Sequence, residues 1–283
     1  MKSTRFGLVA AAAVLALTAS ACGSDDGGSG GSGGSGDSGG GDGIKIGIKF
    51  DQPGLGLKKG NEYTGMDVDV ATYVAQQLGY DADKIEWVQA PSAQRETLIS
   101  TGQVDMVVAT YSITDERKQK VSFAGPYFIA GQDLLVRSDD SSITGPDTLD
   151  GKKLCSVTGS TSAQKVKDKV PGVNLQEFAT YSECVAGLVS GAVDALTTDD
   201  TILAGYASQD QYKGKLKVVG APFSEERYGI GLKKGDTEMC TKVTDAIKKM
   251  INDGDWQTAV DDNLGAAGYK PPAGNPPTPD ACS

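Results

Sequence analysis

The composition of the chain narrows the classes of protein to which it can belong. Its 283 residues include 27 Lys and Arg against 37 Asp and Glu, and the net charge of −10 argues against nucleic acid as a partner. The sequence contains no histidine, so a nucleophile activated by histidine is excluded. Five cysteines without histidine give no metal-ligand spacing. We therefore expect no metal and no cofactor, and any anion site must be built from local cations.

The first 21 residues are predicted to be a signal peptide. Lys2 and Arg5 precede an apolar run over residues 6–17, which is too short for a bilayer that needs roughly 20 apolar residues. The sequence Ala-Ser-Ala-Cys at residues 19–22 resembles a bacterial lipobox, in which the cysteine is lipidated and becomes the mature N-terminus. Ordinary secretion with cleavage near Ala21 is the alternative. Loss of Lys2 and Arg5 changes the net charge from −10 to −12.

Residues 22–43 are predicted to comprise the lipidated Cys22 and, from residue 23, a flexible tether. They are almost wholly Gly, Ser and Asp, and such a segment buries too little apolar surface to offset the entropy of ordering it. A tether after a lipidated cysteine lets a folded domain stand clear of a membrane. We therefore expect a protein that is anchored by lipid to the cell membrane and faces outside.

Strand and helix patterns alternate from Ile44 onward. Strands are predicted at 44–50, 85–89 and 104–109, and helices at 67–79, at 93–101 and after a cap at Thr114. The same alternation restarts with strands at 154–157, 175–179 and 193–197 and helices at 162–169 and 182–190. A helix at 237–251 and another around Trp256 follow. This alternation predicts two α/β lobes with largely parallel sheets.

Two extended stretches, residues 127–135 and 222–232, are predicted to cross between the lobes. Lobe 1 then comprises residues 44–127 and 224–283, and lobe 2 comprises residues 128–223. The tail from residue 271 is rich in proline and has no helix or strand pattern. Domains of this size have a core of their own, and we expect a monomer.

Four cysteines remain if Cys22 carries lipid, and secretion favours disulfides over free thiols. Three pairings are possible. The organisation of the chain favours Cys155–Cys184, inside lobe 2, and Cys240–Cys282, which would hold the tail against lobe 1.

Three segments carry a resemblance to a known family. They are Tyr-Thr-Gly-Met-Asp-Val-Asp-Val at 63–70, Ile-Thr-Asp-Glu-Arg-Lys at 113–118 and Val-Ser-Phe-Ala-Gly-Pro-Tyr at 121–127. Together they resemble the polar amino-acid class, family 3, of the solute-binding proteins of ABC transporters, and within it the glutamate-binding lipoproteins of Gram-positive bacteria. The resemblance implies a two-lobed Venus-flytrap fold that closes on its ligand and delivers it to an ABC transporter permease. Clefts between lobes are preferred ligand sites, which agrees with the two predicted crossings.

The resemblance implies that the backbone groups of an amino acid bind between the lobes. Arg117 matches the arginine that clamps the ligand α-carboxylate, and Ser112 would add a hydroxyl. Gly159 and Thr161 match a helix-opening turn that binds the same carboxylate, although such a turn is also a common N-cap. Asp199 matches the position that binds the ligand ammonium group. Asp200 is the alternative, and both acids could instead cap a helix.

The resemblance also assigns selectivity for an acidic side chain to lobe 1. Lys49, Ser92 and Arg95 match residues that bind the side-chain carboxylate in the glutamate and aspartate branch. Tyr111 could pack over the ligand's aliphatic chain or lie in the core. The excess positive charge in this pocket could be balanced by Asp51 or Asp200.

We therefore expect a binding protein for glutamate, with no catalytic residues. The sequence leaves aspartate, glutamine or another polar amino acid open as the ligand. Two other classes are also open, a dehydratase-like enzyme for small acids and a sensor domain. Carboxylates could support acid–base chemistry in such an enzyme, and the lipobox argues against a sensor attached to a membrane-spanning chain.

Overall fold

A computed structural model describes residues 43–283 of the chain. The predicted signal peptide, the lipidation site at Cys22 and the tether up to residue 42 lie outside these residues. Within residues 43–283, no helix combines the length and the apolar character that a membrane crossing requires.

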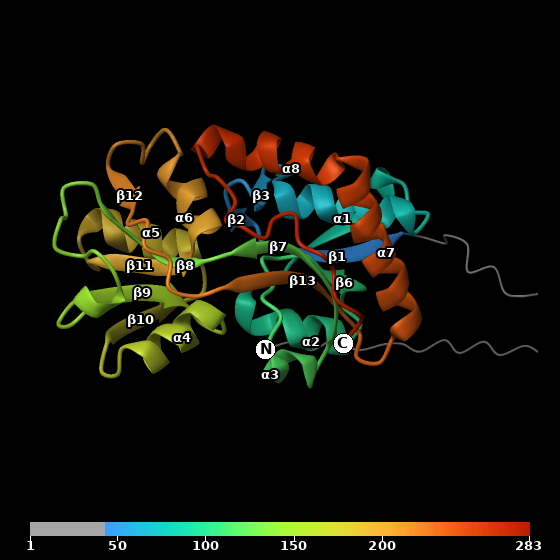
Figure 1. The fold of residues 1–283 in the computed structure, drawn as a ribbon, viewed down its shortest axis with the longest axis horizontal. Coiled ribbons are helices and arrows are strands. Elements are labelled where there is room, and N and C mark those ends of the chain that lie inside the picture. Colours follow the sequence, from blue (N-terminus) through green and yellow to red (C-terminus); the bar gives the residue numbers. More distant parts are fainter. Residues whose placement is uncertain (1–42) are drawn as a thin grey trace, which may run out of the picture. The chain divides into compact units, whose positions relative to one another are not determined.

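Two five-stranded sheets form the framework of the described residues (Figure 1). The sheet of lobe 1 has the strand order β5-β1-β6-β13-β7, and the sheet of lobe 2 has the order β10-β9-β11-β8-β12. The first sheet consists of β1 (Ile44–Ile48), β5 (Ile85–Gln89), β6 (Met106–Val107), β7 (Ser122–Ala130) and β13 (Glu226–Leu232). The second consists of β8 (Gln132–Arg137), β9 (Lys153–Val157), β10 (Asn174–Phe178), β11 (Ala195–Asp199) and β12 (Leu216–Val218).

Helices complete both lobes. Those of lobe 1 are α1 (Met66–Gln77), α2 (Arg95–Ser100), α3 (Asp115–Lys118), α7 (Thr237–Asp253) and α8 (Asp255–Leu264), with the short 3₁₀ turns η1 (Ala82–Lys84), η2 (Ser92–Gln94) and η4 (Gly265–Ala267). Those of lobe 2 are α4 (Thr161–Lys169), α5 (Tyr181–Ser190) and α6 (Asp200–Ala207), with the turn η3 (Pro146–Thr148). A small antiparallel sheet between β1 and α1 consists of β2 (Asp51–Gln52), β3 (Gly56–Lys59) and β4 (Glu62–Thr64).

The strand directions agree with the prediction of largely parallel sheets in two lobes. β1 runs parallel to β5 and β6, and β9 runs parallel to β10 and β11. One strand of each sheet is antiparallel to both neighbours, β13 in lobe 1 and β8 in lobe 2. These two strands lie next to the connections between the lobes, at Gly131 and at residues 219–225. Figure 1 shows β7 and β13 running side by side toward lobe 2.

Local sequence signals explain where several helices begin and end. Gly79, with φ of 93°, follows the end of α1, where a left-handed residue commonly terminates a helix. The hydroxyl of Thr114 accepts a hydrogen bond from the backbone N–H of Arg117 at 3.2 Å, so the predicted cap of α3 is present. β6 is shorter than the strand predicted at 104–109, because only Met106 and Val107 pair with both neighbouring strands.

Both expected disulfides are present in the structure. Cys155–Cys184 joins β9 to α5 inside lobe 2, and Cys240–Cys282 joins α7 to the tail. The tail after residue 271 contains no helix or strand, as predicted. It is nevertheless attached to β7, because the carbonyl of Ser283 accepts a hydrogen bond from the N–H of Phe123 at 2.8 Å.

Three groups of buried apolar side chains hold the lobes together internally. The largest includes Val74, Ile247 and Trp256 from α1, α7 and α8, and it extends to Leu196 and Leu203 in lobe 2. A second group, with Leu98, Val107 and Phe123, lies in lobe 1 beside α2. A third, with Leu134, Val166 and Ala195, lies in lobe 2 beside α4. The residues that contact ligand in the predictions therefore rest on packed sheets.

Candidate functional site

The predicted selectivity residues meet at the carboxyl ends of neighbouring strands in lobe 1. Lys49 follows β1, and Ser92 and Arg95 follow β5, which pairs with β1. The Nζ of Lys49 donates to the Oγ of Ser92 at 2.7 Å. The Nη1 of Arg95 donates to the carbonyl of Ala109 at 3.0 Å, and both cationic side chains are buried. The strand ends bring these groups together because parallel strands finish at the same edge of a sheet.

Positive charge in this part of lobe 1 is not balanced by ion pairs. Among residues 43–283, neither Lys49 nor Arg95 forms a salt bridge, and the Nε of Arg95 has no hydrogen-bond partner. Burial, followed by the charge of Arg95, holds the pKa of Lys49 well below its ordinary value. Burial, followed by the charge of Arg117, lowers the pKa of Arg95 to about 10. A bound anion would relieve both effects.

Arg117 connects the two lobes. Its Nη1 donates to the carbonyl of Ser112 at 2.8 Å, and its Nη2 donates to the carbonyl of Gly159 in lobe 2 at 3.0 Å. Its Nε lies 3.5 Å from a carboxylate oxygen of Glu96. The guanidinium therefore stands at the cleft, with one edge held by lobe 1 and the other directed at lobe 2.

Tyr111 lies beneath both arginines. Its ring centroid is 4.1 Å from the Cζ of Arg95 and 5.0 Å from that of Arg117, and the ring packs against Phe123. The side chain is fully buried. Tyr111 thus supports the two guanidinium groups through cation–π contacts from within the core of lobe 1.

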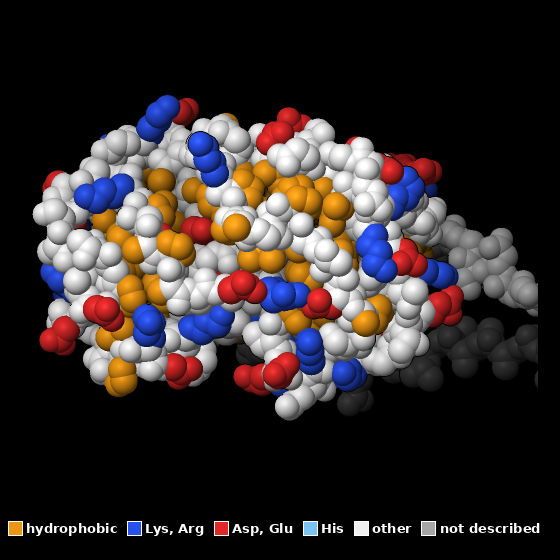
Figure 2. All heavy atoms as spheres, in the orientation of Figure 1, with side chains coloured by type: hydrophobic (Ala, Val, Ile, Leu, Met, Phe, Trp, Pro, Cys, Tyr) orange, Lys and Arg blue, Asp and Glu red, His pale blue; other side chains and the backbone are white. Residues whose placement is uncertain are grey.

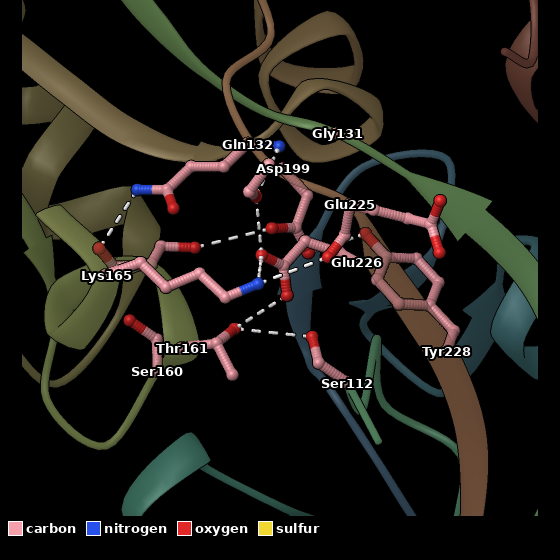
Figure 3. A network of polar contacts seen from close by, with 12 residues as sticks. Ser112, Gly131, Gln132, Ser160, Thr161, Lys165, Asp199, Glu225, Glu226 and Tyr228 are labelled. Atoms are coloured by element: carbon pink, nitrogen blue, oxygen red, sulfur yellow. Dashed lines mark hydrogen bonds and ion pairs between the residues drawn. The ribbon is translucent and has the colours of Figure 1, made fainter. Parts of the chain in front are cut away.

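Lobe 2 presents the start of α4 and the end of β11. The Oγ1 of Thr161 is 3.3 Å from the Oγ of Ser112 in lobe 1, and it donates to the carboxylate of Glu226 at 3.1 Å (Figure 3). Gly159 has φ of 76°, and a Cβ there would lie 2.7 Å from the Cα of Ala93. Only glycine allows the two lobes to approach so closely at this turn.

Asp199 is the buried acid of the site. Its carboxylate accepts hydrogen bonds from the hydroxyls of Tyr228 at 2.7 Å and Ser162 at 3.3 Å. Glu226 lies nearby on β13 and pairs with Lys165 at 2.5 Å. Burial, followed by the negative charge of Glu226, raises the pKa of Asp199 to about 8. A bound cation would therefore stabilise the ionised form of Asp199.

Asp200, the alternative to Asp199, is engaged elsewhere. Its carboxylate accepts hydrogen bonds from the N–H groups of Thr201 and Gly131 and from the hydroxyl of Tyr269. These contacts attach it to the first connection between the lobes and to the segment after α8.

A small cavity between the lobes collects groups from both of them. Ser92, Arg95 and Thr110 line it from lobe 1, and Ser160, Thr161, Ser162, Tyr181, Asp199 and Ile202 line it from lobe 2. A neighbouring cavity is lined by Lys49, Asp51 and Tyr181, among others. Arg117, Gly159 and Thr161 line a wider cleft outside both cavities. The structure thus brings eight of the nine predicted ligand-binding residues to one interlobe region, and the ninth, Tyr111, lies beneath it.

Several lining residues were missing from the sequence prediction. Tyr181 is the first residue of α5 and follows the carboxyl end of β10, and this position at a strand end was the available signal. Burial, followed by the charge of Asp199, raises its pKa to about 12. Thr110 follows β6 with φ of 44°, an unusual conformation for a β-branched residue. The N–H of Thr110 is held by Asp67 at 2.9 Å.

The outer surface offers no concentrated positive patch on the face that Figure 2 shows. Lys and Arg side chains are interspersed there with Asp and Glu. Given the net charge of −10, attraction of an anion depends on the cations in the cleft rather than on this face of the molecule.

Comparisons with known proteins agree on one family. A model of the bacterial extracellular solute-binding proteins, family 3, matches residues 44–266. The chain is 49% identical over 274 residues to the glutamate-binding protein GluB of Corynebacterium efficiens, covering 93% of this chain and 91% of that protein. It is 37% identical over 215 residues to the ABC transporter glutamine-binding protein GlnH of Bacillus subtilis, covering 75% and 78%.

A solved structure shows the same fold. It is an ancestral arginine-binding protein bound to glutamine, with a TM-score of 0.74 and 34% sequence identity. The match covers 79% of this chain and 98% of that chain.

Proposed function

We propose that this chain, which belongs to family 3 of the bacterial extracellular solute-binding proteins, binds glutamate between its lobes and delivers it to the permease of an ABC transporter. A member of this family is a binding protein rather than an enzyme. The name of the Corynebacterium relative, a glutamate-binding protein with 49% identity, supports glutamate as the ligand.

The observation that carries the proposal is the pair of buried cations that have no ion-pair partner within the described part of the chain, residues 43–283. Lys49 and Arg95 lie with Ser92 at the side of the cleft that belongs to lobe 1. Arg95 lines the same cavity as Asp199, the acid that lobe 2 contributes. A ligand with one ammonium group and two carboxylates matches this distribution, because buried charges need partners of opposite sign.

We assign the three charged groups of glutamate to three parts of the site. Arg117 and Ser112, with the start of α4 at Gly159 and Thr161, would bind the α-carboxylate. Asp199 would bind the ammonium group. Lys49, Ser92 and Arg95 would bind the side-chain carboxylate, and Tyr111 would hold both arginines in place.

The hydrogen bonds of Thr161 refine this assignment. Its hydroxyl donates to Glu226, so its proton is already engaged. The backbone N–H groups of Thr161 and Ser162 open α4, and N–H groups in the first turn of a helix have no partner within that helix. They are therefore the donors that lobe 2 offers to the α-carboxylate.

Glutamine is the second candidate, because the Bacillus subtilis relative is named a glutamine-binding protein. An amide brings no charge to Lys49 and Arg95, so glutamine would leave both cations without a partner. Aspartate carries the required charge on a shorter side chain. Both ligands therefore belong in the same experiment.

Calorimetric titration of the purified protein with glutamate, aspartate, glutamine and arginine tests the proposal. We expect glutamate to bind most tightly and arginine not to bind, because a third cation would face Lys49 and Arg95. Preferential binding of glutamine would contradict the assignment of these two residues, and binding of none of the four would contradict the proposed ligand class.

We also propose that Cys22 carries the lipid that holds the protein at the outer face of the cell membrane. The support is the lipobox-like sequence at residues 19–22 and the polar tether after it. In a bacterial expression host, Cys22→Ala should release the protein from the membrane fraction into the medium. Continued retention of the variant on membranes would refute the anchor.

A further inference from the structure

Asp51 lies in lobe 1, but its carboxylate makes its hydrogen bonds to lobe 2. Its Oδ2 accepts the backbone N–H of Tyr181 at 3.0 Å and that of Ser182 at 3.2 Å. The same atom lies 3.3 Å from the hydroxyls of Ser182 and Tyr206. The hydroxyl of Tyr206 also donates to the backbone carbonyl of Asp51.

These contacts complete the hydrogen bonding at the start of α5. Thr180 caps this helix by accepting the N–H of Glu183 at 3.3 Å. The N–H groups of Tyr181 and Ser182 remain, and Asp51 accepts both of them. Helix N-termini carry partial positive charge, so a carboxylate is the favoured partner at this place. One lobe thus supplies the helix and the other lobe supplies its acid.

The backbone beside Asp51 fits closely against a second helix of lobe 2. A Cβ added at Gly205 in α6 would lie 2.0 Å from the carbonyl oxygen of Pro53. β2, which contains Asp51, contacts both α5 and α6, and Figure 1 shows it beside them. The segment 51–53 is therefore held between two helices of the opposite lobe.

We propose that Asp51 is a positioning residue that fastens lobe 1 to α5 when the cleft is closed, and so holds a ligand in place without contacting it. Tyr181 connects this fastening to the site, because its backbone N–H binds Asp51 and its side chain lines the cavity. The inference rests on the proposed function in one respect, that closure of the lobes retains an amino acid.

The fastening has a kinetic consequence. Its hydrogen bonds form only when the lobes meet and break when they separate, so their loss should speed opening and ligand release. Hydrogen bonds to a charged group, as here, imply a rise in dissociation rate of about ten- to one-hundred-fold when they are removed. The association rate should change much less, because variants of one binding site differ in affinity mostly through their dissociation rates.

Stopped-flow measurement of glutamate dissociation from the full-length protein tests the proposal. The variants are Asp51→Ala, which removes the carboxylate, and Asp51→Asn, which removes its charge and keeps its shape. Tyr206→Phe removes the second attachment of the same segment. If Asp51 and Tyr206 act together, the dissociation rate of the double variant should rise by less than the product of the two single-variant factors.

Asp236→Asn is a matched control. Asp236 also accepts a hydrogen bond at a helix start, from the backbone N–H of Met239 in α7 at 3.0 Å, but this contact lies within lobe 1. This variant should lower the melting temperature of the ligand-free protein and leave glutamate dissociation unchanged. Asp51→Ala should do the opposite, with faster dissociation and little change in the melting of the ligand-free protein.

Glutamine separates the fastening from direct ligand contact. Tyr206→Phe should speed the dissociation of glutamate and glutamine by the same factor, because Tyr206 is uncharged and holds only the backbone and carboxylate of Asp51. Asp51→Ala should also speed the dissociation of both ligands, but less for glutamate, because loss of the negative charge beside Lys49 favours a bound carboxylate there. An unchanged dissociation rate in Asp51→Ala would overturn the proposal, as would an equal acceleration in Asp236→Asn. Failure of the wild-type protein to bind glutamate would instead contradict the proposed function, and the measurements with glutamine would still test the fastening.

Discussion

The buried charged residues that we assign to the ligand divide between the two lobes by sign. Lobe 1 provides the cations Lys49, Arg95 and Arg117, all buried, with Glu96 paired to the last of them. Lobe 2 provides the buried acid Asp199 together with hydroxyl and backbone N–H groups. An amino acid carries both signs of charge, so neither lobe offers it a complete set of partners. Its recognition requires both lobes to meet.

With the proposed ligand, this division would couple binding to closure of the lobes. A ligand shifts a conformational equilibrium only as far as it binds one state better than the other. In the proposed assignment, glutamate held by the cations of lobe 1 would gain Asp199 and the start of α4 only in the closed state. The contrast between the lobes therefore predicts that substitutions in lobe 1 affect carboxylates, and that substitutions in lobe 2 affect the ammonium group and closure.

The largest effect is expected from Arg117→Ala. The α-carboxylate is common to all amino acids, so every ligand should lose affinity, by about thirty-fold to a few thousand-fold. The ratio of glutamate to glutamine affinity should stay nearly constant. Calorimetry with both ligands measures the effect. Arg227→Ala is the control, because Arg227 forms an exposed pair with Asp280 outside the cleft and should leave both affinities unchanged.

A smaller and more selective effect is expected from Arg95→Ala. Glutamate should lose affinity strongly, whereas glutamine should lose much less, because glutamine brings no charge to Lys49 and Arg95. The ratio of the two affinities, measured by the same titrations, should therefore fall. Equal losses for both ligands would contradict the division of the site between Arg95 and Arg117. Unchanged glutamate binding by Arg95→Ala would instead mean that Lys49 is the residue that selects acidic over neutral ligands.

Local signals were sufficient to predict much of the fold. The alternation of strand and helix patterns predicted two α/β lobes, and the spacing along the chain agreed with both disulfides. The sheet β2–β3–β4 was missed, because its strands have two to four residues and lie among glycines and lysines without a clear period. The three-residue strand β12 also went unpredicted, and the helix α6 was expected only as the alternative in which Asp199 and Asp200 cap a helix.

Contacts across the cleft could not be predicted from local patterns. Asp51 was expected to be one of two acids that balance the pocket, yet its carboxylate binds the start of α5. Tyr181 and Glu226 were not expected in the site, although Tyr181 lines the cavity and Glu226 binds both Thr161 and Lys165. The roles of these residues depend on how two lobes meet, and no periodicity or cap within one segment contains that information.

The smallest expected effect is on the stability of the ligand-free protein, which should depend on pH through the protonation of Asp199 in lobe 2. The folded-state pKa of Asp199 is raised to about 8 from 3.8, so between these values the folded protein holds a proton that the unfolded chain has released. Stability therefore falls as pH rises through this window, by at most about 1.4 kcal/mol per pH unit for one proton. Asp199→Asn imitates the protonated acid and removes this loss.

Urea unfolding of wild type and Asp199→Asn at pH 6, 7 and 8 measures the difference. The variant should gain stability relative to wild type as pH rises. The lowered pKa of Lys49 makes the free energy of unfolding rise with pH, but it does so in both proteins, so this contribution cancels in their difference. Asp67→Asn is the matched control in lobe 1. Burial raises the pKa of Asp67 only to about 6, so its advantage should level off near pH 6. A stability difference that stays constant from pH 6 to 8 in Asp199→Asn would mean that Asp199 is already ionised in the ligand-free protein. The acid of lobe 2 would then stand ready for the ammonium group, and binding would require no loss of a proton from it.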